Sequence, residues 1–251
     1  CEDPDCSAQF FCQECEPDNL ESNIGTAVVT GLIPINDNYI GSCGGDGGAD
    51  EIFVWTAPSS GTFVMDTMDW YRDTVLYVFD GECTGDEVAC NSEPNTSQRS
   101  VVSIEVQEGQ TMSIVVDSNG DDSRETGLSI YPQSDPCEST FQDQDSWSES
   151  FSHVDTSFAG GCVPVIAPVW WEWTAPEDGL YQVATNTSDF DTVLYILDGC
   201  AGEVLTCNDD ADSLYAGGSV SLLAGDTILI GVGSFAGRES SGTIGVSVSR
   251  D

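Results

Sequence analysis

Asp73-Thr-Val-Leu-Tyr-Val-Phe-Asp-Gly81 is a short apolar run that recurs almost unchanged as Asp191-Thr-Val-Leu-Tyr-Ile-Leu-Asp-Gly199. β-Branched and aromatic residues favour strands, and the closing Asp-Gly is typical of a turn. The two copies lie 118 residues apart, which is the size of a small domain rather than of a solenoid repeat. The sequence therefore predicts two homologous β domains in tandem.

The flanks of this strand repeat as well. A Trp-Thr-Ala-Pro corner precedes it in both copies, at Trp55 and Trp173, and a pair of cysteines leading into an Asn follows it. Other short runs alternate apolar and polar residues between Gly, Asp and Asn turns, and no segment has a sustained helical period. We therefore expect an all-β fold of two tandem jelly-roll-type β-sandwiches stapled by disulfides, with an N-terminal arm at 1–15 and domains at 16–133 and 134–251. The expected strands are Ile52–Thr56, Thr62–Thr67, Thr74–Asp80, Val101–Val106, Met112–Asp117 and Leu128–Tyr131, then Trp170–Thr174, Leu180–Thr187, Thr192–Asp198, Val220–Leu223, Thr227–Gly233 and Thr243–Ser249.

The chain of 251 residues is strongly acidic: 44 Asp and Glu residues stand against five Arg and no Lys, and the net charge is −39. Such a charge repels nucleic acids and anionic lipid surfaces, so neither is an expected partner. It suits a saline habitat or neutralisation by divalent cations. No apolar run approaches the roughly 20 residues that span a bilayer, so we expect no transmembrane segment.

Eleven cysteines indicate an oxidising, extracytoplasmic compartment, and we expect a secreted or cell-surface protein. Because the two cysteines after the repeated strand have the same spacing in both copies, we expect each pair to close a short hairpin. The cysteine that opens each repeat would then pair with the one that precedes the Trp strand, and each such loop is worth roughly 3 kcal/mol in the chain-entropy model. The expected bonds are Cys83–Cys90, Cys200–Cys207, Cys15–Cys43 and Cys137–Cys162.

Three further cysteines, Cys1, Cys6 and Cys12, lie in the N-terminal arm, so one of them is left unpaired. At a processed N-terminus Cys1 would carry a lipid anchor, as in bacterial lipoproteins. Alternatively, it forms a disulfide to another chain, or it only marks where the sequence was cut. Phe10 and Phe11, between cysteines, suit a plug or an added strand for a neighbouring subunit.

Several strings in fixed order resemble the bacterial pre-peptidase C-terminal domain family. They are Asp189-Phe-Asp-Thr-Val-Leu-Tyr195, Cys207-Asn-Asp-Asp210 and Ala224-Gly-Asp-Thr-Ile-Leu-Ile230, with a looser version at Asp69–Tyr77 in the first repeat. The resemblance covers most of both repeats. It implies β-sandwiches of secreted bacterial proteins, which often follow proteases, and some members bind calcium or extracellular polymers. No protease precedes the domains in this sequence.

Residues suited to catalysis are scarce. The chain has a single His, His153, and no Lys, and the patterns Gly-x-Ser-x-Gly and His-Glu-x-x-His are absent. Carboxylate pairs abound in a chain this acidic, so they do not identify a glycosidase. We therefore expect a non-enzymatic protein.

Calcium is the most promising chemistry, since it prefers carboxylate, amide and backbone oxygens. In each repeat, acidic residues lie at the start of the repeated strand, and an Asn lies at the end of the following segment, after the second cysteine. If these two ends are neighbours in the sandwich, their oxygens could bind one ion. The alternative is that these Asp and Asn side chains cap turns. The candidate ligands are Asp189, Asp191, Asn208, Asp209 and Asp210 in the second repeat, and Asp69, Asp73 and Asn91 in the first.

Two other acidic loops come close to calcium motifs without matching them. Asp117–Asp122 begins like an EF-hand but lacks its Gly and its closing Glu, so a hairpin loop is the simpler interpretation. Gly44-Gly-Asp-Gly-Gly-Ala-Asp50 nearly fits a calcium-binding nonapeptide, but its Asp falls one place late and no tandem array follows.

Adjacent aromatic residues offer a possible sugar platform at Trp70-Tyr71 and Trp170-Trp171. Neighbours on a strand face opposite sides, so one Trp of the second pair is expected in the core and the other outside. The alternative is that these rings serve core or interface packing. Asn95 and Asn186 lie in glycosylation sequons, which chance alone produces often in a chain rich in Ser and Thr.

These patterns favour a non-catalytic secreted or surface protein. Our leading interpretation is a structural subunit that self-assembles into an extracellular fibre or layer, with the arm engaging the next subunit and calcium screening the charge. The alternatives are a calcium-stabilised adhesion module that binds a polysaccharide or a protein, and accessory domains of a secreted hydrolase.

Overall fold

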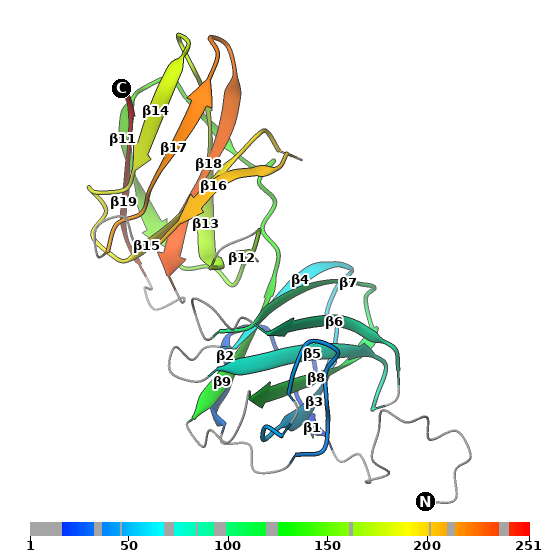
Figure 1. Cartoon of the computed structure of the whole chain (residues 1–251). Helices are drawn as coiled ribbons and strands as arrows, with labels where there is room; N and C mark the ends of the chain where they lie inside the picture. Colours follow the sequence, from blue (N-terminus) through cyan, green and yellow to red (C-terminus); the bar gives the residue numbers. More distant parts are fainter. Residues whose placement is uncertain are drawn as a thin grey trace, which may run out of the picture. The chain divides into compact units, whose positions relative to one another are not determined.

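A computed structural model describes residues 17–32, 37–45, 47–67, 73–83, 85–92, 99–118, 125–160, 163–200, 202–209, 214–235 and 241–251. These residues form strands and turns, and none of them belongs to a helix that could cross a membrane. The chain divides into two compact units, Cys1–Pro132 and Gln133–Asp251, each built as a β-sandwich (Figure 1).

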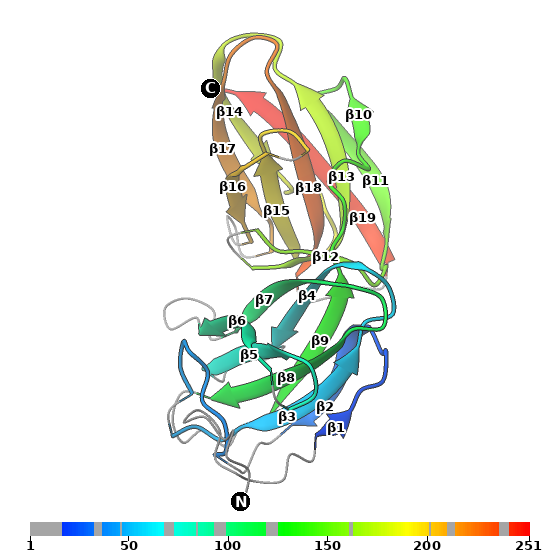
Figure 2. The ribbon, with the colours of Figure 1, turned by 90° about the vertical axis from the view of Figure 1, so that its right-hand side faces the viewer.

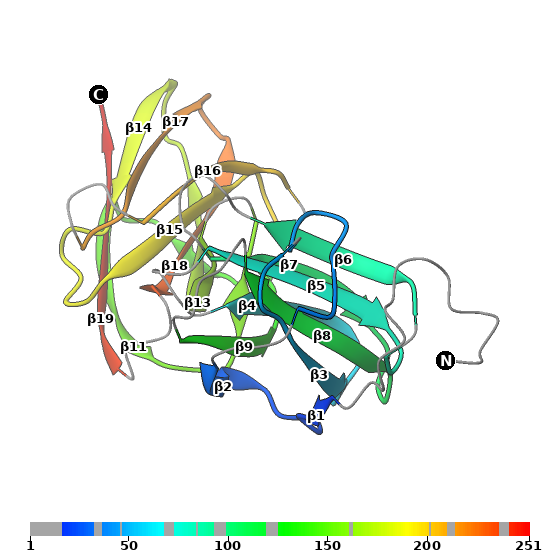
Figure 3. The same ribbon diagram turned by 60° about the horizontal axis from the view of Figure 1, so that its bottom comes forward.

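The first unit packs two sheets face to face (Figure 3). One sheet has the strand order β1-β3-β8-β5-β6 and the other the order β2-β9-β4-β7. Apart from β1, which runs parallel to β3, neighbouring strands are antiparallel. The strands are β1 (Asp18–Asn19), β2 (Gly25–Leu32), β3 (Glu51–Thr56), β4 (Gly61–Thr67), β5 (Thr74–Asp80), β6 (Glu87–Ser92), β7 (Val101–Val106), β8 (Thr111–Ser118) and β9 (Thr126–Pro132).

The second unit repeats this arrangement (Figure 2). Its sheets have the orders β10-β13-β18-β15-β16, with β12 beside β13, and β11-β19-β14-β17. The strands are β10 (Thr140–Gln142), β11 (Ser146–Ser152), β12 (Ser157–Phe158), β13 (Val165–Thr174), β14 (Gly179–Ala184), β15 (Thr192–Leu197), β16 (Val204–Asn208), β17 (Gly217–Leu222), β18 (Thr227–Phe235) and β19 (Ser241–Arg250).

The strand order confirms the all-β sandwich fold that the sequence predicts. The order β3-β8-β5-β6 in the first unit corresponds to β13-β18-β15-β16 in the second, and β9-β4-β7 corresponds to β19-β14-β17. The register repeats too, because Glu51 lies opposite Val116 as Val169 lies opposite Val232. Each predicted strand is present, and β1, β2, β6, β10, β11, β12 and β16 are additional strands that the sequence patterns did not indicate.

The repeated strand is buried on both faces, which explains why it is apolar throughout. On β5, Leu76 and Val78 point into the core between the sheets, where Trp55 and Phe63 also pack. Tyr77, on the opposite face, belongs to a second apolar cluster outside the sheet. A continuous apolar run is typical of a strand that is covered on both sides.

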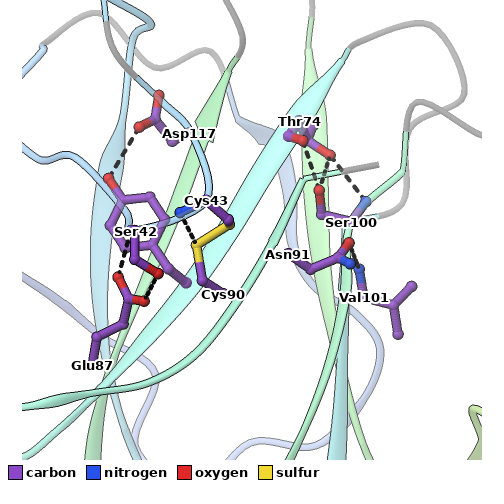
Figure 4. The surroundings of a disulfide bond; sticks show 10 residues. Ser42, Cys43, Thr74, Glu87, Cys90, Asn91, Ser100, Val101 and Asp117 are labelled. Atoms are coloured by element: carbon purple, nitrogen blue, oxygen red, sulfur yellow. Dashed lines mark hydrogen bonds between the residues drawn. A yellow bond between two sulfur atoms is a disulfide. The ribbon is translucent and has the colours of Figure 1, made fainter. Parts of the chain in front are cut away.

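Residues 37–45 and 47–50, between β2 and β3, cover this outer face of the first unit. The loop arches over β5 and β8 in two views (Figures 1 and 3). Tyr39 packs against the outer cluster, and the backbone of Gly41 lies so close to Tyr77 that a Cβ there would be 2.6 Å from the ring. The N–H and the hydroxyl of Ser42 both donate hydrogen bonds to Glu87 on β6 (Figure 4).

In the second unit an aromatic residue covers the outer face instead. Phe158 on β12 makes edge contacts with Trp170 and Tyr195, with ring centroids 5.0 and 5.1 Å apart. Trp170 and Trp171 do face opposite sides of β13, as strand geometry requires. Both are buried, at 4% and 0% exposure, so these two rings have the packing role that was the alternative to a sugar platform.

The predicted disulfide pairing is also wrong, although the cysteines it used within the described residues are disulfide-bonded. The structure joins Cys43 to Cys90 and Cys137 to Cys200, which excludes all four expected pairs. Cys90 lies opposite Tyr77 on the outer face, under the loop that carries Cys43 (Figure 4). Each of these bonds therefore joins distant segments rather than closing a hairpin. Cys83 and Cys207 are disulfide-bonded as well.

Candidate functional site

The structure places the two asparagines of the expected calcium sites near the ends of strands β6 and β16. The Asn91 side chain accepts a hydrogen bond from the N–H of Val101, at 3.1 Å, and Asn208 accepts one from Gly217, at 3.4 Å. These equivalent contacts link the end of β6 to the start of β7, and the end of β16 to the start of β17. Each amide oxygen thus accepts a hydrogen bond from the backbone of the next strand along the chain.

The carboxylates expected beside them lie at strand ends. Asp189 accepts a hydrogen bond from the N–H of Thr243, at 2.7 Å, and the backbone carbonyl of Asp191 accepts one from Phe235, at 3.1 Å. In the part of the chain that the structure describes, no three His, Cys, Asp or Glu side chains are grouped to hold a metal ion. Calcium at these residues therefore stays a prediction. Asp73 and Asp209 are described, whereas Asp69 and Asp210 lie outside the described residues.

Several other predicted residues also lie outside the described part of the chain: Cys1, Cys6, Phe10, Phe11, Cys12, Cys15, Trp70, Tyr71, Asn95 and Cys162. Asn186 is exposed in a turn, where a glycan could be attached.

The second unit has a shallow pocket of about 310 Å³ at one end of its β11-β19-β14-β17 sheet. The pocket combines an apolar lining with charged groups, which is the common make-up of a small-molecule site. Arg250 forms an ion pair with Glu177, and both side chains are substantially exposed. The residues that line it include Asp145, Pro176, Glu177, Tyr181, Val248 and Arg250.

Local packing holds the pocket in shape. The hydroxyl of the buried Tyr181 donates a hydrogen bond to the carbonyl of Glu177, at 2.7 Å, and so fixes the turn that carries this carboxylate. The side chain of Arg250 lies directly over Gly179, where a Cβ would be 2.5 Å from Nε. A glycine at this position therefore lets the guanidinium rest against the strand.

The residues that line this pocket differ from those at the equivalent place in the first unit. Tyr181 lies opposite Arg250 on β14 and β19, and the matching pair on β4 and β9 is Phe63 opposite Pro132. The first unit therefore lacks both the phenol and the guanidinium at this place, and sequence comparison of the two repeats could have found the difference.

The first unit has a different polar feature, two buried carboxylates under the covering loop. The register that sets Glu51 opposite Val116 brings Asp50 and Asp117 opposite each other at the end of β3 and β8. They are 1% and 0% exposed. Oδ2 of Asp117 accepts a hydrogen bond from the Tyr77 hydroxyl, at 3.0 Å (Figure 4).

Burial dominates the ionisation of this pair. It raises the pKa of Asp117 to about 7, against the hydrogen bonds from the Ser118 N–H and the Tyr77 hydroxyl. It also raises the pKa of Asp50 to about 6, and the negative charges of Asp37 and Glu51 add to that shift. Burial and the nearby Asp117 raise the pKa of Tyr77, so the phenol stays protonated.

The raised pKa values of Asp50 and Asp117 predict that the first unit is more stable at acid pH, when a chelator keeps divalent cations away. Because the folded carboxyls hold their protons more tightly than the unfolded chain does, the free energy of unfolding falls as the pH rises through about 6 to 7. Lowering the pH from about 7.5 to about 5.5 should raise the free energy of unfolding by about 2 kcal/mol. Urea unfolding in EDTA measures the slope, and Asp117→Asn should flatten it. An unchanged slope in that variant would contradict the assignment.

Comparison with known proteins corrects the family expected from the sequence. Residues 135–231 match a family model described as galactose binding domain-like and associated with the type IX secretion system. The resemblance to pre-peptidase C-terminal domains is therefore wrong. No curated protein matches the sequence.

Solved structures that align with the chain include the M60 catalytic domain with the CBM51-1 and CBM51-2 domains of ZmpB from Clostridium perfringens. That alignment has 10% identity and a TM-score of 0.26, and it covers 92% of this chain but only 37% of that one, well under two thirds. The tandem CBM51 modules of a family 98 glycoside hydrolase from Streptococcus pneumoniae align with 10% identity and a TM-score of 0.24, over 89% and 88% of the two chains. A fucolectin from Morone saxatilis aligns with 10% identity and a TM-score of 0.19, over 80% and 86%. TM-scores this low carry no argument about function.

Proposed function

We propose that this chain is a non-catalytic, extracellular carbohydrate-binding protein whose sugar site is the pocket of the second unit. The observation that carries the proposal is the coincidence of this pocket with the galactose binding domain-like match. Asp145, Glu177 and Tyr181 lie within the matched residues 135–231, and Arg250 on the neighbouring strand β19 completes the site.

The chemistry of the lining suits a sugar. A guanidinium donates hydrogen bonds in a fixed fork and a carboxylate accepts them, so Arg250 and Glu177 together can engage two neighbouring hydroxyls. Pro176 and Val248 offer apolar edges to the C–H face of a pyranose ring. Because the ion pair is already formed, little side-chain order has to be gained on binding.

The charge of the chain indicates which glycans to expect. A net charge of −39 repels sulfated and uronic polysaccharides at ordinary ionic strength. A neutral hexose at the end or along the side of a glycan is therefore the expected ligand. The disulfides are typical of proteins outside the cytoplasm, where such glycans are displayed.

Arg250→Gln and Glu177→Gln should each weaken glycan binding about tenfold or more, since each removes one side of the hydrogen-bonding pair; tenfold corresponds to about 1.4 kcal/mol. A glycan array identifies the ligand, and titration calorimetry then gives the affinities. Both positions are exposed, so the variants should fold normally. Glu203→Gln, at an exposed carboxylate away from the pocket, is the charge-matched control and should bind as the wild type does.

Two results would count against the proposal. If the wild-type protein binds no neutral glycan, the proposed function is wrong. If it binds one and both pocket variants retain full affinity, the function stands but the site lies elsewhere. Self-assembly through the arm, a role beside a secreted hydrolase and an anchor at Cys1 stay predictions, and no described residue favours any of them over carbohydrate binding.

A further inference from the structure

We propose that Asp50 and Asp117 bind a divalent cation of the calcium class in the first unit, beside the loop residues Gly45, Gly48 and Ala49. This site differs from the calcium ligands expected from the sequence, and it is independent of the sugar pocket.

One carboxylate oxygen of Asp50 is free to coordinate a metal ion. Oδ2 accepts hydrogen bonds from the N–H groups of Asn38 and Tyr39, both at 2.7 Å. Oδ1 is buried, and among the described residues no donor reaches it. A buried carboxylate oxygen without a partner costs free energy, so it calls for a group that neutralises it.

Asp117, the cross-strand neighbour of Asp50, also keeps coordination capacity. Oδ1 accepts from the Ser118 N–H, at 2.6 Å, and Oδ2 accepts from Tyr77. Each carboxylate oxygen has two lone pairs, so both can still bind a metal. The buried Arg99 pairs with Asp66, so its charge is already committed. The chain has no Lys to supply another cation.

The covering loop brings its backbone directly against the Asp117 carboxylate. A Cβ at Gly45 would lie 2.1 Å from Oδ2 of Asp117, and one at Gly48 would lie 2.7 Å from Oδ1. Ala49 is tied to the same strand end, because its N–H donates to the Ser118 hydroxyl at 3.1 Å. Only glycine allows the backbone so close to the Asp117 oxygens. A calcium ion takes six to eight oxygen ligands, so it would complete its coordination here with peptide oxygens and water.

The second unit shows the same place without the carboxylates. Continuing the equivalent register beyond Val169 and Val232 gives Pro168 and Gly233, and a Cβ at Gly233 would be 3.0 Å from the Pro168 backbone. The hydroxyl of Tyr195, which matches Tyr77, donates instead to the carbonyl of Val163, at 2.9 Å. The fold therefore does not require acids here, and their presence in the first unit points to a ligand.

Calcium binding is tested by melting the whole protein in EDTA and in millimolar CaCl₂. The wild type should melt about 5 °C or more higher with calcium, because a ligand bound only by the folded state stabilises it. Asp50→Asn should remove this shift. The asparagine oxygen can still accept hydrogen bonds from the two N–H groups. Its NH₂ group takes the place of Oδ1, and because this group only donates hydrogen bonds, it cannot coordinate a cation. In EDTA this variant should melt at or above the wild type, since a buried charge is gone.

Asp117→Asn is the second test, and Asp189→Asn, at a carboxylate of the second unit, is the matched control. Titration calorimetry with calcium should give a binding event that both first-unit variants lose and the control keeps. The proposal is overturned if the wild type shows no shift, if both first-unit variants keep it, or if only Asp189→Asn loses it. The Arg250→Gln protein should respond to calcium as the wild type does, so failure of the sugar site would leave this result intact.

Discussion

Replacing Arg99 by Met is expected to lower the free energy of unfolding of the first unit by about 3–5 kcal/mol. The Arg99 and Asp66 side chains form an ion pair at 3% and 1% exposure. Removing the guanidinium leaves a carboxylate buried without its counter-charge, which is among the costliest single changes in a protein core. Burial already raises the pKa of Asp66 even with Arg99 beside it, so the variant should take up a proton on folding.

Removing both charges should cost far less. The second unit carries Ala184 and Tyr215 at the equivalent places, so the fold tolerates an uncharged pair there. We expect the double variant Asp66→Ala with Arg99→Met to lie within about 1–2 kcal/mol of the wild type, because no buried charge is left uncompensated. The free energy of unfolding of both variants is measured by denaturant unfolding, with hydrogen exchange of peptides from each unit as the signal. A loss below 1 kcal/mol in the single variant would contradict the prediction.

Removing the Cys43–Cys90 bond by a double Cys→Ala change should destabilise the first unit by about 4 kcal/mol. The bond joins residues separated by 47 positions, and chain-entropy loss in the unfolded state grows with loop length. It also ties the covering loop to β6, so hydrogen exchange should accelerate at Gly41 and Ser42. The test compares the free energy of unfolding and the hydrogen exchange of the wild type with those of the double variant, under non-reducing conditions.

The matched control is the double Cys→Ala change at Cys137 and Cys200, whose bond spans 63 positions. Its effect should be of similar size and confined to the second unit. Peptide mapping without reductant should recover both cross-linked pairs. Recovery of a Cys83–Cys90 or Cys200–Cys207 peptide would contradict the pairing.

The sequence patterns predicted best those strands whose residues are fully buried. The run Val75–Phe79 is apolar at every position because both of its faces are covered. The same patterns missed β6 and β16, whose residues are only partly buried and carry a weaker signal. The disulfides were misassigned for a related reason. Cys83 and Cys90 are near in sequence, but Cys90 lies beneath the covering loop and Cys83 lies in the turn after β5.

The sequence by itself determined two homologous all-β domains, an acidic surface and an oxidising environment, because strand period, charge and cysteine content are properties of short segments and of composition. Only the tertiary structure decided which distant residues meet. Each of two acidic loops fails its calcium motif alone, yet the pairing of β3 with β8 brings Asp50 of one against Asp117 of the other. The pocket proposed to bind a sugar depends likewise on β14 lying beside β19. Such sites arise from strand register between remote segments, which no local pattern contains.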